Sequence, residues 1–243
     1  MNAPRLYVTA PLCPGAQVAL HAGQARYLGA VMRRAAGDEV RLFNGQDGEW
    51  LARLETVAKA GASAVCNVLL RAQTATPGLV LAFAPIKGDR GDMMIEKAVE
   101  LGATRLIPVI TARTIVRKPN LERWRARAIE AAEQCERLEA PPVEAPLELD
   151  RFLAARTGRA LLFCDEAAAG SAPVPALPAG EVTVLIGPEG GFAPDERTAI
   201  LAAPGVRVMS LGPRILRADT AAYAALVLAG AAPAARLRRL AHG

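Results

Sequence analysis

The chain has 243 residues and a formal net charge of +5; 52% of its residues are hydrophobic, 22% are charged and 4% are aromatic. This length allows one large domain or two modest ones, and the aliphatic composition predicts an α/β core and argues against a surface of base-stacking rings. No uncharged apolar run is long enough for a transmembrane helix, and no apolar segment follows Arg5 as in a signal peptide, so we expect a cytoplasmic protein. The basic excess suits a polyanion such as RNA, because each neutralised phosphate releases counterions.

The cysteines and histidines do not predict a metal site. The four cysteines are scattered without CxxC spacing, and both histidines lie far from any of them. Thiols spaced in this way are typical of reduced, buried side chains rather than of zinc ligands.

The first part of the chain is rich in short apolar runs separated by glycine-containing turns, which predicts a small β-rich domain, a barrel, over residues 1–72. A helix is predicted over Gly23–Arg34. The stretch Arg71–Gly78 contains a proline and no periodic pattern, so it is interpreted as a linker to a second domain over residues 78–243. The predicted strands are Val40–Phe43, Trp50–Leu54 and Ala64–Leu70.

From Leu79 onward, apolar strands alternate with helices. Continuous apolar strands between helices predict a mostly parallel sheet that is covered on both faces. The predicted strands are Leu79–Ala84, Leu106–Ile110, Ala160–Cys164, Val182–Ile186 and Val206–Leu211. The predicted helices are Asp92–Leu101, Leu121–Arg137 and Thr220–Ala231.

Two glycine-containing motifs follow two of these strands. The first is Ile186–Phe192 (IGPEGGF), and the second is Leu211–Ala221 (LGPRILRADTA). Glycine turns let the backbone approach a ligand, and Asp219 or Thr220 is a candidate cap whose helix would present free N–H groups. Because both motifs follow strands of a parallel sheet, we expect them to converge on one cleft at the carboxyl edge.

The paired motifs resemble the C-terminal motifs of the 16S ribosomal RNA uracil-N3 methyltransferases, a family of the SPOUT superfamily. The similarity extends to Lys87 with Glu96–Gly102 (EKAVELG), to Ala131–Cys135 (AAEQC) and, more loosely, to the segment from Tyr27 to Asp38 with Arg5 before it. Most of the chain is thus covered, in the family's order.

The resemblance implies a knotted C-terminal SPOUT domain of α/β class, a PUA-like N-terminal RNA-binding domain, a homodimer, and S-adenosylmethionine as the cofactor. The substrate would be N3 of a uridine in the 16S RNA of the small ribosomal subunit. The implied cofactor-binding residues are Ile186, Gly187, Pro188, Gly190, Gly191, Leu211, Gly212, Ile215, Leu216, Thr220 and Ala221. The implied RNA-binding residues are Arg5, Arg26, Arg33, Arg34 and Lys87.

The candidate catalytic residues are Glu189, Arg217 and Asp219. Uracil N3 is protonated at neutral pH, so methyl transfer needs a proton acceptor, and Glu189 and Asp219 are the only carboxylates in the two motifs. Arg217 would anchor a phosphate or stabilise negative charge on the uracil oxygens. Each carboxylate has an alternative structural role, Glu189 in orienting its loop and Asp219 in capping the helix.

Three residues depart from the family pattern: Arg26 stands where histidine is usual, Glu136 where glycine is common, and Asp219 where glutamate is usual. Two other readings stay open at this point. One is a SPOUT enzyme for another ribosomal or transfer RNA base, and the other is a non-catalytic RNA-binding protein with a degenerate cofactor pocket.

Overall fold

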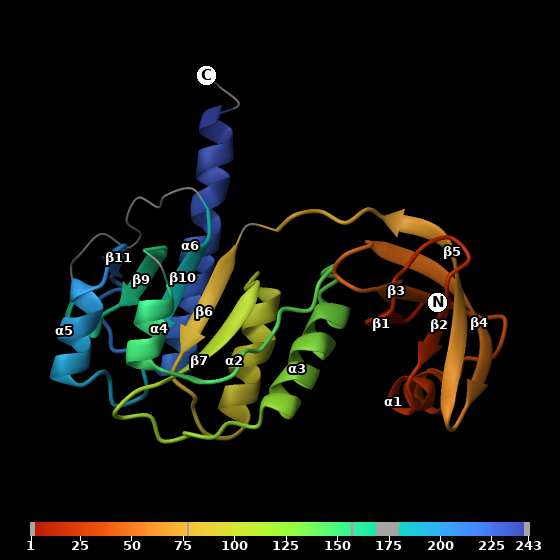
Figure 1. The fold of residues 1–243 in the computed structure, drawn as a ribbon, viewed down its shortest axis with the longest axis horizontal. Helices are drawn as coiled ribbons and strands as arrows, with labels where there is room; N and C mark the ends of the chain where they lie inside the picture. The colour runs from red at the N-terminus through yellow and green to blue at the C-terminus, as the bar shows by residue number, and fades with distance from the viewer. Residues whose placement is uncertain (1–2, 77, 157, 169–179, 241–243) are drawn as a thin grey trace. The chain divides into compact units, whose positions relative to one another are not determined.

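The computed structural model describes residues 3–76, 78–156, 158–168 and 180–240, the last nine of these by backbone alone. The chain forms two compact units. One comprises Met1–Ala75 together with Ala132–Ala140, and the other comprises Thr76–Ala131 together with Pro141–Gly243. Figure 1 shows the elements of each unit.

The N-terminal unit contains a five-stranded mixed sheet with the order β1-β3-β4-β5-β2. Strand β1 is parallel to β3, and the other pairs are antiparallel. The β-rich N-terminal domain is therefore confirmed, with strands longer than the sequence patterns indicated. The strands are β1 (Arg5–Tyr7), β2 (Gln17–Leu20), β3 (Glu39–Phe43), β4 (Glu49–Ala58) and β5 (Gly61–Arg71).

Alternating side chains of these strands form one apolar core. Val40 and Leu42 of β3 and Leu54 of β4 are almost fully buried, as the period of two residues in a strand requires. Trp50 packs in the same core, and its indole N–H donates to the Asp47 carbonyl at 2.9 Å.

The helix predicted over Gly23–Arg34 is shorter and has two parts. It begins as α1 (Ala22–Arg26) and continues as a π-helical turn (Tyr27–Val31), in which the Met32 N–H donates to the Tyr27 carbonyl. Arg33 then adopts a left-handed φ of 52°, which ends the helical path. Arg33 and Arg34 consequently lie beyond the helix rather than on it.

The C-terminal unit is built on a six-stranded, all-parallel sheet with the order β11-β9-β10-β6-β7-β8. The predicted parallel sheet is confirmed, and the two-residue β8 is an addition at its edge. All five residues of β6 and of β10 are buried, as expected for central strands covered on both faces. The strands are β6 (Leu79–Phe83), β7 (Arg105–Ile110), β8 (Leu147–Glu148), β9 (Ala160–Cys164), β10 (Val182–Ile186) and β11 (Val206–Met209).

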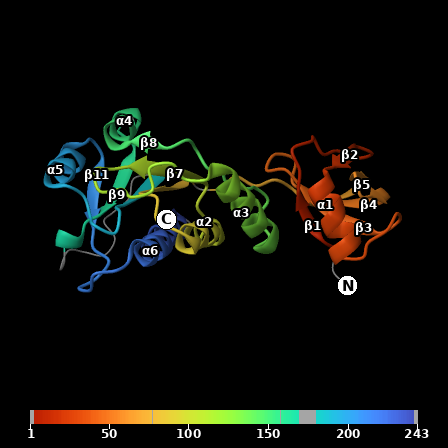
Figure 2. The same ribbon diagram turned by 90° about the horizontal axis from the view of Figure 1, so that it is seen from below.

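Helices cover both faces of this sheet. Figure 2 shows α4 and α5 on one face and α2 and α6 on the other. Phe152 of α4 and Ile200 of α5 pack with strand residues such as Val80 and Leu185. Helices α4 and α5 were not expected. The helices are α2 (Asp89–Glu100), α3 (Leu121–Gln134), α4 (Leu149–Ala155), α5 (Pro194–Ala202) and α6 (Ala218–Leu240).

The described residues contain neither a membrane-spanning helix nor a cluster of metal-binding side chains. None of the helices that the structure describes combines the length and the apolar character needed to cross a membrane. Among the same residues, no group of three or more histidine, cysteine, aspartate or glutamate side chains is arranged to hold a metal ion.

Candidate cofactor and substrate site

A pocket of about 350 Å³ lies at the carboxyl edge of the parallel sheet. Three adjacent strands, β11, β9 and β10, end there, and their last residues Met209, Cys164 and Ile186 all line it. Ligands of open α/β sheets bind at this edge because the loops that leave parallel strands meet there.

The structure brings both glycine motifs to this one pocket. The second motif also contributes Pro213, Arg214 and Ala218, which were not singled out from the sequence. Gly190, Thr220 and Asp219 belong to the motifs but do not line the pocket. The predicted site residues that line it are Ile186, Gly187, Pro188, Glu189, Gly191, Leu211, Gly212, Ile215, Leu216, Arg217 and Ala221.

The first motif forms a closely packed turn between β10 and α5. Gly191 has a φ of +68°, and its N–H donates to the Pro188 carbonyl at 2.9 Å. The ring of Phe192 packs edge-on against Phe163 of β9, with centroids 5.4 Å apart, so the turn is fixed against the sheet. Arg113 adds a hydrogen bond from its guanidinium to the Gly190 carbonyl at 2.7 Å.

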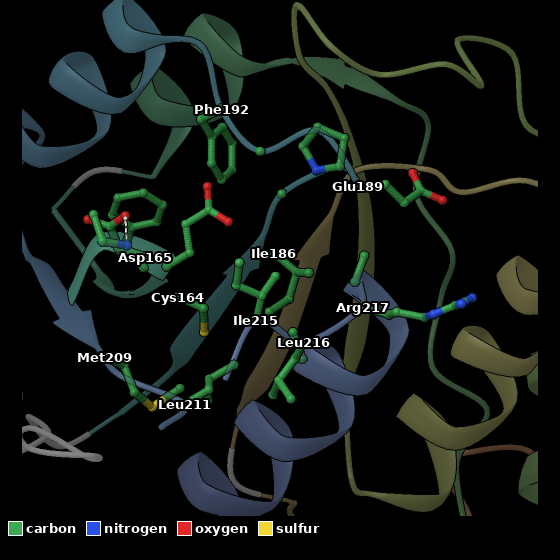
Figure 3. A pocket seen from close by; sticks show the side chains of 18 of the residues that line it. Cys164, Asp165, Ile186, Glu189, Phe192, Met209, Leu211, Ile215, Leu216 and Arg217 are labelled. Atoms are coloured by element: carbon green, nitrogen blue, oxygen red, sulfur yellow. Dashed lines mark hydrogen bonds between the residues drawn. The ribbon is translucent and has the colours of Figure 1, made fainter. Parts of the chain in front are cut away.

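The second motif connects β11 to α6 and presents apolar side chains. Gly212 has a φ of +100°, which few other residues adopt. Ile215 lines the pocket yet is 89% exposed, and Leu216 lies beside it (Figure 3). Helix α6 begins at Ala218, so Asp219 and Thr220 lie inside its first turn, and the expectation that one of them caps it was wrong.

A third wall of the pocket was missed from the sequence. The segment that follows β9 contributes Asp165 and Glu166. Asp165 is buried and accepts two hydrogen bonds from Arg197 of α5, at 3.0 and 2.7 Å. Burial raises the pKa of the Cys164 thiol to about 12, so this cysteine stays protonated. The sequence did offer a way to predict this wall. Strand β9 was itself predicted, and in a parallel sheet it ends at the same edge as β10 and β11.

Charged groups gather on one side of the pocket. In Figure 3 the side chains of Glu189 and Arg217 point away from Phe192 and Asp165. Arg90 of α2 reaches Glu189, with 3.7 Å between its Nη1 and Oε1. The guanidinium also donates to both oxygens of Asp219, at 2.9 Å from Nε and 2.8 Å from Nη2. Arg90, which sequence reasoning missed, thus contacts both motif carboxylates.

The pocket suits a small molecule with apolar and polar parts. Its volume falls in the range of about 300–1,000 Å³ that is typical of such sites. An isoleucine as exposed as Ile215 would lose its contact with water if a ligand covered it. Glu166 offers a carboxylate for a cationic group of the ligand, and the backbone of the two glycine turns offers N–H and C=O groups.

The structure assigns Arg5 a structural role, which corrects its prediction as an RNA contact. Its side chain is buried against the Phe43 ring and pairs with the buried Glu49. The guanidinium also donates to the Ala132 carbonyl at 2.7 Å and to the Arg137 carbonyl. Only 4% of this side chain is exposed, and its guanidinium nitrogens already have protein partners.

The other predicted RNA-binding residues lie at or near the surface. Arg26 and Arg33 are exposed at the two ends of the π-helical turn, and Arg34 is half-buried. Lys87 is exposed in the loop that connects β6 to α2 and starts at the carboxyl edge of the sheet.

Family profiles match both parts of the chain. The RNA methyltransferase domain matches residues 70–230, and the RNA methyltransferase PUA domain matches residues 22–65. Together with the parallel sheet and the pocket at its carboxyl edge, these matches define an RNA methyltransferase with an attached PUA domain.

Whole-chain relatives give the family within that class. Ribosomal RNA small subunit methyltransferase E of Rickettsia conorii is 33% identical over 91% of this chain and 93% of its own length. The protein of the same name from Synechocystis is 36% identical over 91% of this chain and 75% of its own length. The chain belongs to the ribosomal RNA small subunit methyltransferase E family.

Solved structures agree with this assignment. The Neisseria gonorrhoeae ribosomal RNA small subunit methyltransferase E, bound to S-adenosylmethionine, has a TM-score of 0.84 and 31% identity, covering 93% of this chain and 96% of its own. A methyltransferase from Legionella pneumophila in complex with the same cofactor has a TM-score of 0.85 and 31% identity, covering 96% and 98%.

Proposed function

We propose that this protein transfers the methyl group of S-adenosylmethionine to N3 of a uridine in the 16S RNA of the small ribosomal subunit. The observation that carries the proposal is the single pocket formed by the two glycine motifs, with Glu189 and Arg217 on one side of it. The names of the whole-chain relatives, and the cofactor bound to two related structures, support the substrate and the methyl donor.

The reaction requires the protein to position the methyl donor against the acceptor and to remove the N3 proton. Methyl transfer from a sulfonium is an in-line displacement, so the pocket must hold donor and acceptor in contact. The apolar side of the pocket, with Ile186, Leu211 and Ile215, would hold the cofactor, which supplies an electrophilic methyl group. The charged side would hold the base, where Glu189 can take the N3 proton and Arg217 can bind a phosphate or a uracil oxygen.

Residues 1–72 would form the RNA-binding domain, with Arg26 and Arg33 as contacts, and residues 78–243 the catalytic domain with its trefoil knot. A homodimer would cover the half-exposed apolar side chains of Met93 on α2 and Val227 on α6, two helices that pack together. A substrate in the ribosomal subunit implies a cytoplasmic location.

The test is methyl transfer from radiolabelled S-adenosylmethionine to small ribosomal subunits from a strain that lacks this protein, followed by nucleoside analysis. We expect label in 16S RNA as 3-methyluridine. Label in transfer RNA alone would overturn the substrate but keep the enzyme class. Calorimetry that detected no cofactor binding, with no label in any RNA, would favour a non-catalytic RNA-binding protein.

A further inference from the structure

The two motif carboxylates differ in their surroundings, and Arg90 makes the difference. The Nε and Nη2 groups of Arg90 each bind one oxygen of Asp219, which is the two-pronged geometry that fits a guanidinium to a carboxylate. The third nitrogen, Nη1, lies 3.7 Å from Glu189 Oε1, too far for a hydrogen bond. Arg90 is therefore hydrogen-bonded to both oxygens of Asp219. It lies near Glu189 but forms no hydrogen bond with it.

Asp219 is held as an anion from several directions. Besides the two bonds from Arg90, its Oδ1 accepts a hydrogen bond from the Thr220 N–H at 2.9 Å. Its place in the first turn of α6 adds the favourable helix dipole. The hydrogen bonds from Arg90 outweigh the opposing effect of burial and lower the pKa of Asp219. A carboxylate with both oxygens occupied and a low pKa is a poor proton acceptor.

Glu189 is placed differently. It lines the pocket, its side chain is 37% exposed, and within the described part of the chain its carboxylate accepts no hydrogen bond. In Figure 3 that side chain lies on the same side of the pocket as Arg217. Its oxygens are therefore open to a substrate proton.

We propose that Glu189 accepts the N3 proton of uridine and that Arg90 is a positioning residue, which fixes Asp219 in place and leaves Glu189 free to react. This inference rests on the proposed function. The N3–H bond breaks and its proton passes to a Glu189 oxygen. The electron pair left on N3 forms the bond to the methyl carbon, while the methyl–sulfur bond of the sulfonium donor breaks and its pair stays on sulfur. Glu189 then releases the proton to water.

Loss of the two hydrogen bonds from Arg90 to Asp219 would change the electrostatic environment of several neighbouring ionisable groups. Asp219 would become an unpaired anion near Glu189, and a like charge makes each carboxylate harder to ionise. The ionisable groups around this point are Arg90, Lys97 and Glu96 from α2, Glu189 and Arg217 from the two loops, and Asp219 and Tyr223 from α6.

The first experiment measures single-turnover methyl transfer to small subunits at saturating S-adenosylmethionine, as a function of pH. Glu189→Gln should slow transfer by about 100-fold or more, the usual scale for loss of a general base, with cofactor affinity by calorimetry unchanged. Asp219→Asn and Arg90→Lys should each slow it less, and the double variant should be no slower than the slower single one. Wild-type rates in Glu189→Gln, or a larger loss in Asp219→Asn, would overturn the proposal.

Arg105 provides a matched control. Its side chain is 34% exposed, as is that of Arg90, and its Nε and Nη2 donate to Glu144 at 2.9 and 2.6 Å. It begins β7, so it lies at the amino edge of the sheet, away from the pocket. Arg105→Lys should transfer methyl at the wild-type rate. Slowing equal to that of Arg90→Lys would mean a general loss of stability and would overturn the positioning role.

A second readout does not depend on turnover. Carboxyl carbon NMR should show Asp219 titrating below its ordinary range in the full-length wild type and at higher pH in Arg90→Lys. The same titration in both proteins would overturn the role of Arg90, whether or not any RNA is methylated. A wild type that methylates no RNA but shows this shift would overturn the proposed function and the Glu189 step while retaining the Arg90–Asp219 coupling.

Discussion

At Gly187 the pocket is too closely packed to accept a larger side chain without movement of a neighbour. A Cβ at this position would lie 2.7 Å from Cε2 of Phe192. The ring cannot move away freely because it packs against Phe163, and overpacking of this kind costs about 1–3 kcal/mol. At Gly190, in the same turn, a Cβ would meet only the Arg113 side chain, at 3.6 Å, which is an ordinary contact.

We therefore expect Gly187→Ala to weaken S-adenosylmethionine binding by about tenfold or more, which corresponds to about 1.4 kcal/mol lost from the pocket. Gly190→Ala, at a residue outside the lining, should weaken it much less. Isothermal titration of both purified variants with the cofactor measures the difference. Equal affinity in the two variants would show that the Gly187–Phe192 contact does not shape the pocket.

At the scale of the elements, the C-terminus of α3 has an unusual residue. The Arg137 N–H donates to the Ala132 carbonyl at 3.2 Å, five residues back, and Glu136 between them has a φ of 60°. This is the Schellman ending of a helix, in which glycine usually takes the left-handed position. Glu136 occupies it here at a steric cost, offset in part by an exposed ion pair with Arg41 at 3.2 Å.

Glu136→Gly should raise the free energy of unfolding by about 0.5–1 kcal/mol, because relief of the left-handed strain exceeds the loss of an exposed ion pair. Glu136→Ala loses the same ion pair but keeps a Cβ, so it should be less stable than the wild type. Urea unfolding of the three proteins gives the order. If glycine proved no better than alanine at this position, the strain argument would be wrong.

At the scale of the whole molecule, the chain leaves the N-terminal unit after Ala75, returns for Ala132–Ala140 and leaves again. The returning segment is joined to the sheet of that unit by buried charge. Glu49 is 2% exposed and pairs with Arg5 and with Arg71, and these two arginines donate to carbonyls of the returning segment, Arg71 at 2.9 Å to that of Glu136. Removing one partner of such a buried cluster costs about 3–5 kcal/mol.

The Glu49 cluster makes the stability of the N-terminal unit depend on pH. Burial alone would raise the pKa of Glu49, but hydrogen bonds from Arg71 and Arg5 outweigh it, and the folded-state pKa lies below the ordinary value of 4.5. The stabilisation is therefore complete above pH 4.5 and is lost as the pH falls through the lower folded-state pKa. Glu49→Gln should be less stable at neutral pH and should vary less with pH below 4.5.

Each unit has its own fluorescent reporter for this measurement, since the only two tryptophans of the chain are Trp50 in the N-terminal unit and Trp124 in the other. Urea unfolding followed through Trp50, in a Trp124→Phe background, compares wild type and Glu49→Gln at several pH values. A pH dependence unchanged by Glu49→Gln would assign the acid sensitivity to other carboxylates.

The sequence determined the elements that need only local information. Apolar runs of about five residues became β6, β9 and β10 because burial on both faces demands continuous apolar side chains. The glycine motifs were also predictable from local information, since the residues of a turn themselves specify its conformation. Short elements such as β1, β2 and α4 were missed because three to seven residues carry too little periodicity.

Tertiary structure decided which residues meet. Arg5 and Arg90 are both arginines far from the glycine motifs in the sequence, yet one is buried against the Phe43 ring and the other binds Asp219. No local pattern separates these roles, because the hydrogen-bond partners lie 44 to 132 residues away for Arg5 and 129 residues away for Arg90. The sequence by itself determined the fully apolar strands of the parallel sheet, the glycine turns and the family they resemble. Only the fold decided that Arg90 donates two hydrogen bonds to Asp219 and none to Glu189, because hydrogen bonding depends on distance in space.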